Sequence, residues 1–514
     1  MKTPGVYIVE KNAFPNSVVE VETAVPAFIG YTQKAFSRGQ DLTNRPLQIS
    51  SLNEFHELFG FGPEHVFKVS IKKSLAVLNK RSRAAEVTYG DKTYQFTHAN
   101  EGYLLYSSLR MFFNNGGGKC FVVSVGSYED KISHDTLNAG LALLVKEQVP
   151  TIVVVPDAMR LDAQLAKEVH SQTLMHCADM KNRIAILDIP QGDEDDPEVI
   201  TSFRTSVGKD NLSYGTAYYP WLQTSLFTER QFGLEHIDKS NGLFTDLLQE
   251  EFCDTGLDVS DGTMDQIASF NYTESIELFK FKRSDKKEDA VKRDDIARLN
   301  EFLHTSSWVY RIIMKKLADK MNLLPPSGAI AGVYTLVDSQ RGVWMAPANV
   351  SLNCVDRPAV SISHDEQKDL SIDTDGGKSI NAIREFIGEG VVVWGARTLD
   401  GNSLDWRYIN VRRTMIMLGE SVKLAAKAYV FEPNTENTWI TMKSMISNFL
   451  TGIWKRGGLA GAVPADAFSV HVGLGETMTP EEILEGILRI TVLVAPSRPA
   501  EFIEITFQQQ QQRS

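Results

Sequence analysis

The sequence predicts a multidomain α/β protein with a mostly parallel-sheet middle domain, an α+β C-terminal core domain and an extended strand arm at each end. Continuous β-branched runs alternate with amphipathic segments between residues 104 and 222, a pattern typical of a parallel sheet that is buried on both faces. Long helical periodicities dominate residues 379–495. Short segments with strand periodicity, set apart by prolines, occur at both ends of the chain.

The two ends have the pattern of short strands. The chain opens with TPGVYIVE at residues 3–10 and closes with EFIEITF at residues 501–507, where apolar and polar residues alternate from Ile503 onward. A terminal strand that cannot pair alone suggests an arm that completes a sheet, with a neighbouring subunit as one candidate partner. Hinges are expected at residues 12–17 and 496–499. The residues predicted to form these inter-subunit strands are Val6, Tyr7, Ile8, Val9, Phe502, Ile503, Ile505 and Phe507.

The middle domain is predicted to begin with a buried strand and to continue as alternating helices and strands. Ser51 is the expected N-cap of a short helix that ends at residue 59, with Glu54 at the capping-box position. A hairpin is expected around Gly90 and Asp91, because alternating aromatic and polar residues flank this turn. Further helices are predicted over residues 104–114, 136–146 and 162–181, and strands over 26–31, 120–125, 151–155, 183–189 and 214–222.

The C-terminal core domain is predicted to be rich in helices. The segment 438–455 carries its apolar residues on one helical stripe. A further helix is predicted to start at Thr479, with Thr479 as the N-cap, Pro480 at the first helical position and Glu482 at the third. The other predicted elements are helices over residues 379–386 and 408–431 and strands over residues 391–394 and 488–495.

The chain length of 514 residues is too great for a single hydrophobic core. Two segments, residues 61–100 and 228–325, interrupt the α/β pattern and are interpreted as exposed insertions. Residues 280–298 are dense in both charge signs, and residues 294–322 are predicted as one long, solvated helix. The predicted division is an N-terminal linking arm at 1–24, a middle domain at 25–360, a C-terminal core domain at 361–495 and a C-terminal linking arm at 496–514.

Charge and cysteine content exclude several classes of function. The formal net charge is −12 and no basic stripe offers phosphate contacts, so nucleic acid is not expected as a partner. Four well-separated cysteines form no CxxC pair, which argues against a zinc or disulfide framework and favours a reducing compartment. No signal segment or bilayer-length apolar run is found. We therefore expect a soluble protein that is assembled in a cytoplasm without direct membrane insertion.

No catalytic, cofactor-binding or metal-binding residue is predicted. The chain lacks GxSxG, HExxH and GxxxxGK[ST] motifs. His170 and His176 are six residues apart on one predicted helix, so they do not share a face. Asp157 and Asp188 lie at the C-terminal ends of two predicted parallel strands, which is the edge where α/β folds bind ligands, but position alone does not make a site.

The long helix over residues 408–431 begins with a pair of arginines. Arg412 and Arg413, with Glu420 one to two turns later, are expected to form exposed intrahelical and interhelical salt bridges. Each such pair contributes little to stability, although small contacts repeated over many identical subunits can define a lattice.

Motifs along the chain carry a resemblance to a known family. The N-terminal TPGVYIVEKNAFPNSVVEVETAVPAFIGYT, the strands VPTIVVVPDAM and RIAILDIP, and four C-terminal stretches resemble contractile tail sheath proteins. The C-terminal stretches are GEGVVVWGARTL, WRYINVRRTMIMLGESVKLAAKAYVFEPN, WITMKSMISNFLTGIWKRGGLAGAVPADAFSVHVG and ILRITVLVAPSRPAEFIEITF. The match is ordered and covers both ends and most of residues 340–510, whereas residues 228–325 match no constant family feature. The chain is thus similar to the sheath of a contractile phage tail or of a phage-tail-like extracellular injection system.

The resemblance implies a structural function without a cofactor. Sheath subunits of this family form hexameric rings that stack helically around an inner tube, and a baseplate signal triggers a contraction that drives the tube through a target cell envelope. The arms link subunits by strand addition, and the middle domain is subtilisin-like in fold without protease function. The implied partners are further copies of the chain, the inner tube protein, and baseplate and tail terminator or cap proteins. The implied location is a virion tail or a released particle, after assembly in the bacterial cytoplasm.

A contact with the inner tube is predicted on the amphipathic helix over residues 438–455. A basic helix face that meets an acidic tube is one interpretation of its polar residues, and simple solvation is an equal alternative. The residues predicted to contact the tube are Lys443, Asn448, Lys455 and Arg456.

Two other functions stay open at this stage. One is a non-contracting baseplate or scaffold protein, and the other is an α/β hydrolase-type enzyme that uses the strand-end residues Asp157 and Asp188.

Overall fold

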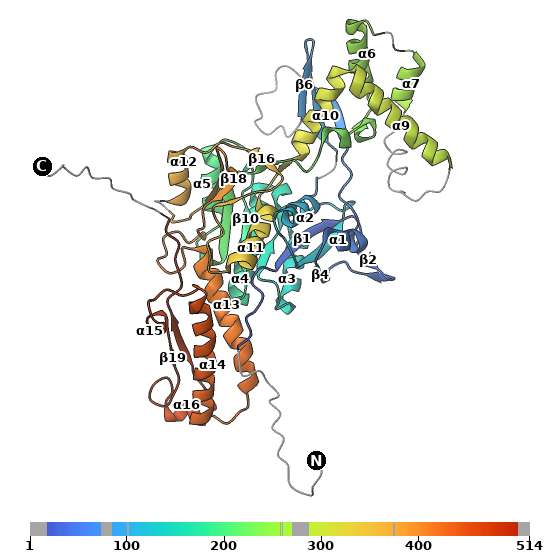
Figure 1. The fold of residues 1–514 in the computed structure, drawn as a ribbon. Coiled ribbons are helices and arrows are strands. Elements are labelled where there is room, and N and C mark those ends of the chain that lie inside the picture. Colours follow the sequence, from blue (N-terminus) through green and yellow to red (C-terminus); the bar gives the residue numbers. More distant parts are fainter. Residues whose placement is uncertain are drawn as a thin grey trace, which may run out of the picture.

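The computed structural model describes residues 18–72, 85–99, 102–257, 259, 261–269, 287–373 and 376–501. Within them the chain forms three bodies, each with its own hydrophobic core (Figure 1). We call them the central body, built on the large sheet, the outer domain, and the C-terminal unit. The predicted multidomain α/β class is therefore confirmed, whereas the subtilisin-like topology and the strand arms stay predictions.

A nine-stranded sheet forms the middle of the central body. Its strand order is β15-β18-β17-β11-β10-β9-β1-β8-β4. The five pairings from β17 to β8 are parallel, and the pairings of β15, β18 and β4 are antiparallel. The strands are β1 (Pro26–Thr32), β4 (Pro46–Ile49), β8 (Cys120–Ser127), β9 (Ile152–Val154), β10 (Ile184–Asp188), β11 (Gly215–Tyr219), β15 (Val350–Ser351), β17 (Asn381–Phe386) and β18 (Gly390–Trp394).

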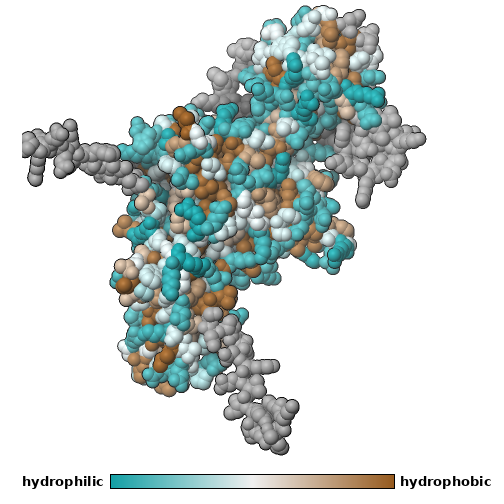
Figure 2. Space-filling view, viewed as in Figure 1, coloured by the Kyte–Doolittle hydropathy of each residue, from teal (hydrophilic) through white to brown (hydrophobic). Residues whose placement is uncertain are grey.

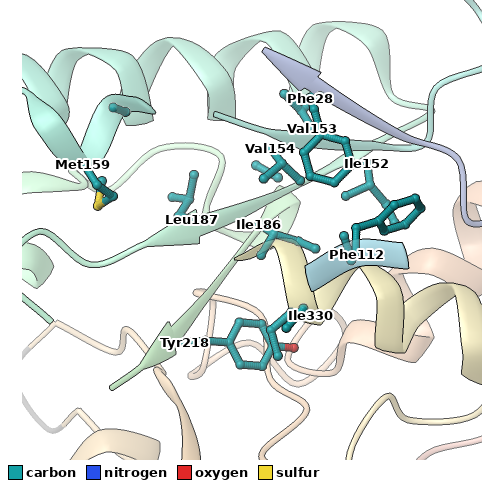
Figure 3. Packing of buried hydrophobic residues seen from close by; sticks show 14 of the residues in the cluster. Phe28, Phe112, Ile152, Val153, Val154, Met159, Ile186, Leu187, Tyr218 and Ile330 are labelled. Carbon is teal, nitrogen blue, oxygen red and sulfur yellow. The ribbon is translucent and has the colours of Figure 1, made fainter. Parts of the chain in front are cut away.

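Helices cover both faces of this sheet, as the continuous apolar strands require. Successive residues of β1 show it: the Phe28 ring lies 5.3 Å from the Phe112 ring of α2, and Ile29 faces α3 at Gly140. Figure 3 shows Phe28 and Phe112 within this packed core. The helices are α2 (Leu105–Asn114) and α11 (Ser327–Arg341) on the Phe28 face, and α3 (His134–Leu143) and α4 (Ala163–Met180) on the other.

A close helix crossing brings α11 onto α2. Gly328 and Gly332 face the backbone of α2, where a Cβ on either glycine would collide with the Ser108 or the Phe112 carbonyl oxygen. The two glycines are four residues apart and therefore lie on one side of the helix. Glycine at both positions lets the two helices approach closely.

The segments predicted as two insertions combine into the outer domain. Residues from both halves contribute to one core, for example Phe67 and Phe96 from the first segment and Leu248 and Ile313 from the second. The first segment contributes one side of this core and the second segment the larger part, so the two segments form one folded unit. The elements are a sheet of order β13-β5-β7-β6, with β5 (Phe67–Ile71), β6 (Ala85–Tyr89), β7 (Lys92–His98) and β13 (Ile237–Asp238), and the helices α6 (Leu243–Thr255), α7 (Asp261–Ser269), α9 (Lys287–Ser306) and α10 (Trp308–Met321).

The prediction of one long helix over residues 294–322 is wrong. The helix breaks at Ser307, whose hydroxyl oxygen accepts a hydrogen bond from the Tyr310 amide at 2.9 Å as the N-cap of α10. The buried carboxylate of Glu251 accepts two more amide hydrogen bonds, from Trp308 at 2.9 Å and Val309 at 3.1 Å. This carboxylate lies 56 residues earlier in the chain than Ser307, so local pattern could not reveal the break.

The prediction of a helix over residues 379–386 is also wrong, because this segment forms the strand β17. Its neighbours decide its conformation: Tyr218 of β11 pairs with Asn381 in parallel, and β18 pairs with it over five residues in antiparallel. Asn381 also donates its side-chain amide to two carbonyl oxygens and accepts from the Arg397 amide. These contacts join distant segments, and they override a weak local helix preference.

The C-terminal unit packs two long antiparallel helices against a two-stranded sheet (Figure 1). Met417, Ile446, Leu450 and Val470 are buried between them, and Val18 from the start of the chain joins the same core. Thr479 caps the short helix α16 with Glu482 in a capping box, as predicted. The elements are α13 (Ile409–Ala426), α14 (Glu436–Lys455), α15 (Pro464–Ala467), β19 (Phe468–His471), α16 (Pro480–Leu484) and β20 (Thr491–Val494).

Shorter elements connect these bodies. Ser51 caps α1 through the Glu54 amide, as predicted from the sequence. The remaining elements are α1 (Leu52–Phe59), α5 (Pro197–Ser206), α12 (His364–Ser371), β2 (Phe36–Ser37), β3 (Gln40–Asp41), β12 (Leu222–Thr224), β14 (Leu323–Leu324) and β16 (Val355–Pro358).

Candidate assembly surfaces

The residues predicted to form the inter-subunit strands, Val6 to Val9 and Phe502 to Phe507, lie outside the described residues, and their role stays a prediction. The structure does describe the two segments from which these arms continue. We call residues 18–25 the N-terminal root and residues 495–501 the C-terminal root.

The N-terminal root connects the C-terminal unit to the central body. Val18 packs in the core of the C-terminal unit, and the Val21 amide donates to the Ser421 hydroxyl of α13 at 3.1 Å. The Val25 amide donates to the Thr151 hydroxyl at 3.0 Å, beside the first strand of the large sheet. The root is therefore fixed to both bodies over its whole length.

A buried ion pair lies at the middle of this root. Arg413 of α13 binds the carboxylate of Asp338 of α11 with two hydrogen bonds, at 2.8 and 2.6 Å, and the two side chains are only 4% and 6% exposed. Thr23 joins them: its hydroxyl donates to Asp338 at 2.5 Å, and its carbonyl accepts from Arg413 at 3.1 Å. The Arg413 guanidinium also lies 4.7 Å from the centre of the Tyr334 ring.

The predicted interhelical salt bridge is found at Arg413, but the expected exposure is wrong, because both side chains of this pair are buried. The expected exposure of Arg412 is wrong too. Arg412 is buried and lies between two aromatic rings, 3.6 Å from the centre of Tyr214 and 4.3 Å from that of Trp406. Such cation–π contacts are worth about 2 kcal/mol or more when the cation is desolvated. Glu420 instead forms an exposed pair with Lys423, at 3.0 Å.

Hydrogen bonds also fix the C-terminal root to the folded bodies. The Ala495 amide donates to the Ala467 carbonyl at 2.8 Å, and the Ser497 amide donates to the Gly458 carbonyl at 3.4 Å. Glu501 then accepts two hydrogen bonds from the guanidinium of Arg397, at 2.8 and 2.6 Å. Residues 496–499, predicted as a hinge, thus lie between two fixed points in this structure.

The two-stranded sheet β19–β20 offers open edges for strand addition. Its strands pair in antiparallel from Phe468 with Val494 to His471 with Thr491, and within the described residues no further strand pairs with either one. Leu493 is 58% exposed on this sheet. An open edge has unpaired amide and carbonyl groups, which bind an added strand through main-chain hydrogen bonds.

The predicted tube-contact residues do not share one face. Asn448 and Lys455 are exposed and seven residues apart on α14, so they lie on the same side of the helix. Lys443 is exposed but turned away from them by about 140°. Arg456 forms an ion pair with Glu20 of the N-terminal root at 2.5 Å and lies 4.9 Å from the centre of the Trp344 ring. Arg456 thus already has partners within the chain, which leaves Asn448 and Lys455 as the pair available on one face.

The strand-end carboxylates of Asp157 and Asp188 are fully engaged in the fold. Asp157 accepts from the amides of Tyr31, Leu104 and Leu105, at 2.8, 2.5 and 3.2 Å. Asp188 accepts from the amide and hydroxyl of Ser327, at 2.9 and 2.5 Å. Burial raises the pKa of Asp157 to about 6 and that of Asp188 to about 7, while these hydrogen bonds lower both. Both carboxylates hold helix starts in place, and neither is open to a ligand.

In the part of the chain that the structure describes, no group of three or more His, Cys, Asp and Glu side chains could hold a metal ion. None of the described helices is long and apolar enough to cross a membrane. On the face shown in Figure 2, apolar and polar residues are interspersed over all three bodies.

Comparison with known proteins shows similarity to tail sheath proteins. The phage tail sheath C-terminal domain family matches residues 402–510, which contain α13, α14 and the β19–β20 sheet. The whole chain is similar to the PVC sheath complex of an extracellular contractile injection system in the contracted state, with a TM-score of 0.60, 25% identity and coverage of 99% of this chain and 98% of that chain. These similarities are to sheath proteins of contractile systems. The helical sheath of the anti-feeding prophage in the contracted state is similar too, with a TM-score of 0.59, 26% identity and coverage of 99% and 100%.

The chain is also similar to curated phage proteins. It is 28% identical to the tail sheath protein of Vibrio phage KVP40 over 202 residues, and 31% identical to that of Salmonella phage ViI over 150 residues. These alignments cover 38% and 29% of this chain, and only 28% and 22% of the relatives' own lengths. The matched proteins are named as tail sheath proteins, and these names favour a structural function over an enzymatic one.

The buried pair predicts a large loss of stability when one partner is removed. Arg413→Met leaves the Asp338 carboxylate buried without its cation, which we expect to lower the free energy of unfolding by roughly 3–5 kcal/mol. Lys423→Ala removes the exposed pair with Glu420, where Lys423 is 62% exposed, and serves as the matched control with an expected change below about 1 kcal/mol. Urea unfolding of the free subunit, followed by circular dichroism, measures both. Equal losses in the two variants would contradict the argument.

The raised pKa of Asp188 predicts a pH dependence of stability. Its pKa of about 7 lies above the ordinary value of 3.8, so between these values the folded protein holds a proton that the unfolded chain releases. This contribution is complete below the unfolded pKa and is lost as the pH rises through about 7. The stability of the wild type relative to Asp188→Asn should therefore fall between about pH 5 and pH 8. Exposed Asp210→Asn is the control, and urea unfolding at both pH values should show no such trend for it.

Proposed function

We propose that this sheath protein polymerises as hexameric rings stacked helically around an inner tube, and that contraction of the stack drives the tube through a target cell envelope. The observation that carries the proposal is the similarity, over 99% of this chain, to two sheaths in the contracted state. The similarity also covers 98–100% of those two chains, which supports a comparable role for this chain. The partners in the lattice are further copies of the same chain.

We propose that the arms link the subunits by adding strands to the β19–β20 sheet of a neighbour. Two features support this. The sheet offers two edges with no partner strand among the described residues, and the chain supplies two arms with strand patterns, one at each end. Strand addition holds subunits through main-chain hydrogen bonds, so the link persists while the rigid bodies change their relative positions.

The firm attachment of both roots supports the division into arms and bodies. Because residues 18–25 and 495–501 are bonded to the bodies, force that acts on an arm is transmitted directly to α11, α13 and the central body. The proposed arms, residues 1–24 and 496–514, thus include segments that are fixed to the bodies, at residues 18–24 and 496–501. We also propose the domain division predicted from the sequence, with a middle domain at residues 25–360 and a C-terminal core domain at residues 361–495.

The other partners of the proposal are the inner tube, the baseplate and the tail terminator or cap. Solved structures named as baseplates of the anti-feeding prophage, with 24–25% identity to this chain, are similar to it over 99% of its length. We propose that the face of α14 with Asn448 and Lys455 approaches the tube. Assembly in the bacterial cytoplasm and a final place in a phage tail or an extracellular particle complete the proposal.

A non-contracting scaffold is the second candidate, and an α/β hydrolase is not supported. The hydrolase depended on free carboxylates at the strand ends, and these are bonded to backbone amides. A scaffold would form discrete rings, whereas a sheath forms cylinders of two lengths. Electron microscopy of the native particle before and after triggering separates the two.

Removal of the arms is the test of the linking mechanism. Deletion of residues 1–17 or of residues 502–514 leaves both roots and all three cores intact, so we expect a folded subunit that no longer forms tubes. Negative-stain electron microscopy detects the tubes, and circular dichroism checks the fold. Tubes of normal length from either truncated chain would refute strand linking.

A charge reversal tests the contact with the tube. Lys455→Glu should reduce the fraction of sheaths that contain a tube. The loss of binding free energy is about 1 kcal/mol or less at each contact between sheath and tube, but it repeats in every subunit. Lys315→Glu changes an exposed lysine of α10 in the outer domain and should leave that fraction unchanged. Counting filled and empty sheaths in micrographs measures the effect. Normal filling in Lys455→Glu particles would remove this face from the proposed contact.

A further inference from the structure

A groove of about 850 Å³ lies between the central body and the C-terminal unit, where the C-terminal root ends. One wall comes from α12 and β18, and the other from residues around Trp344 and Tyr408. The last described residues, Pro499, Ala500 and Glu501, line the groove themselves. The chain therefore continues toward Phe502 from a point on the groove wall.

The groove wall is apolar and incompletely covered. Ile372 is 46% exposed and Trp394 is 39% exposed, and both line the groove with the buried Trp344 and Ile380. Large apolar side chains that stay exposed beside one another mark surfaces that bind another segment. The volume lies within the range of about 300–1,000 Å³ that is usual for sites of small ligands, so it can hold a few residues of a peptide.

The charges on the groove match the sequence that follows Glu501. The groove is lined by the exposed cations Arg341 and Lys368, and among its described lining residues Glu501 is the one carboxylate, already bound by Arg397. The next residues are Phe502, Ile503, Glu504 and Ile505, three apolar residues and one acid. The apolar wall of the groove is complementary to the three apolar residues, and its cationic rim is complementary to the acidic one.

We propose that, in the free subunit, the groove binds residues 502–505 of its own chain and keeps the C-terminal strand away from open sheet edges until a neighbour takes it. Four extended residues span about 13 Å, so the segment begins at the wall and needs no linker. Attachment gives it an effective concentration on the order of millimolar, far above that of free subunits. The inference rests on the proposed strand linking. An exposed strand can pair with other chains and cause aggregation, and binding in the groove would prevent this before assembly.

Photocrosslinking of the free subunit tests the proposal directly. With p-benzoylphenylalanine in place of Ile503, irradiation of dilute full-length protein should give adducts within one chain, on peptides that contain residues 364–372 or 394–397. The same group in place of Gln510, beyond the proposed segment, is the control and should give far fewer of them. Adducts between two chains, adducts on β19–β20, or no adduct on the groove would each overturn the proposal.

A substitution in the groove links the contact to assembly. Ile372→Glu introduces a carboxylate into the apolar wall of the groove, which disfavours binding of an apolar and acidic segment. It should abolish the groove adducts. For nine-tenths of the tails bound in the wild type, it should also increase the initial rate of tube formation about tenfold. Ile387→Glu is the control, because Ile387 is fully exposed on the turn between β17 and β18 and does not line the groove. An unchanged assembly rate in a folded Ile372→Glu subunit would contradict the proposal. The crosslinking result is independent of tube formation, so the proposed function and this inference can fail separately.

Discussion

The buried pair between Arg413 and Asp338 is the interaction on which the arrangement of the chain depends. It joins α13 of the C-terminal unit to α11 of the central body, and Thr23 completes it from the N-terminal root. A buried pair adds little stability over an apolar contact, but it has a strict geometry, since any other arrangement leaves a charge without a partner. We infer that its main role is to fix how the two bodies and the root meet.

An arginine–carboxylate pair also fixes the C-terminal root. Arg397 binds Glu501 with two hydrogen bonds, and Arg397 and Arg413 flank the start of α13 in the sequence. Both predicted arms therefore continue from segments that are bonded to the folded bodies. In a lattice whose subunits change position while their links persist, fixed attachment points allow small interface forces to move whole bodies.

The outer domain has a different kind of attachment. Two long excursions of the chain build it, and at its base the Asn322 side chain exchanges two hydrogen bonds with the backbone of Phe227, at 2.8 and 2.7 Å. Its core is separate from that of the central body. It can thus vary without disturbing the large sheet, which fits a segment that matched no constant feature of the family.

The sequence by itself determined the elements whose signals are local. Neighbouring residues alone determined the apolar strands Ile152–Val154 and Ile184–Asp188, the Ser51 cap and the Thr479 capping box. Long ordered motifs carried the resemblance to tail sheath proteins. Only the tertiary structure decided which elements join over long distances. Asn381–Phe386 forms a strand because β11 and β18 pair with it. Arg413 is buried because it binds a carboxylate 75 residues away in the sequence. Periodicity reports which side of an element is apolar, but it carries no information about the distant segment that will cover that side.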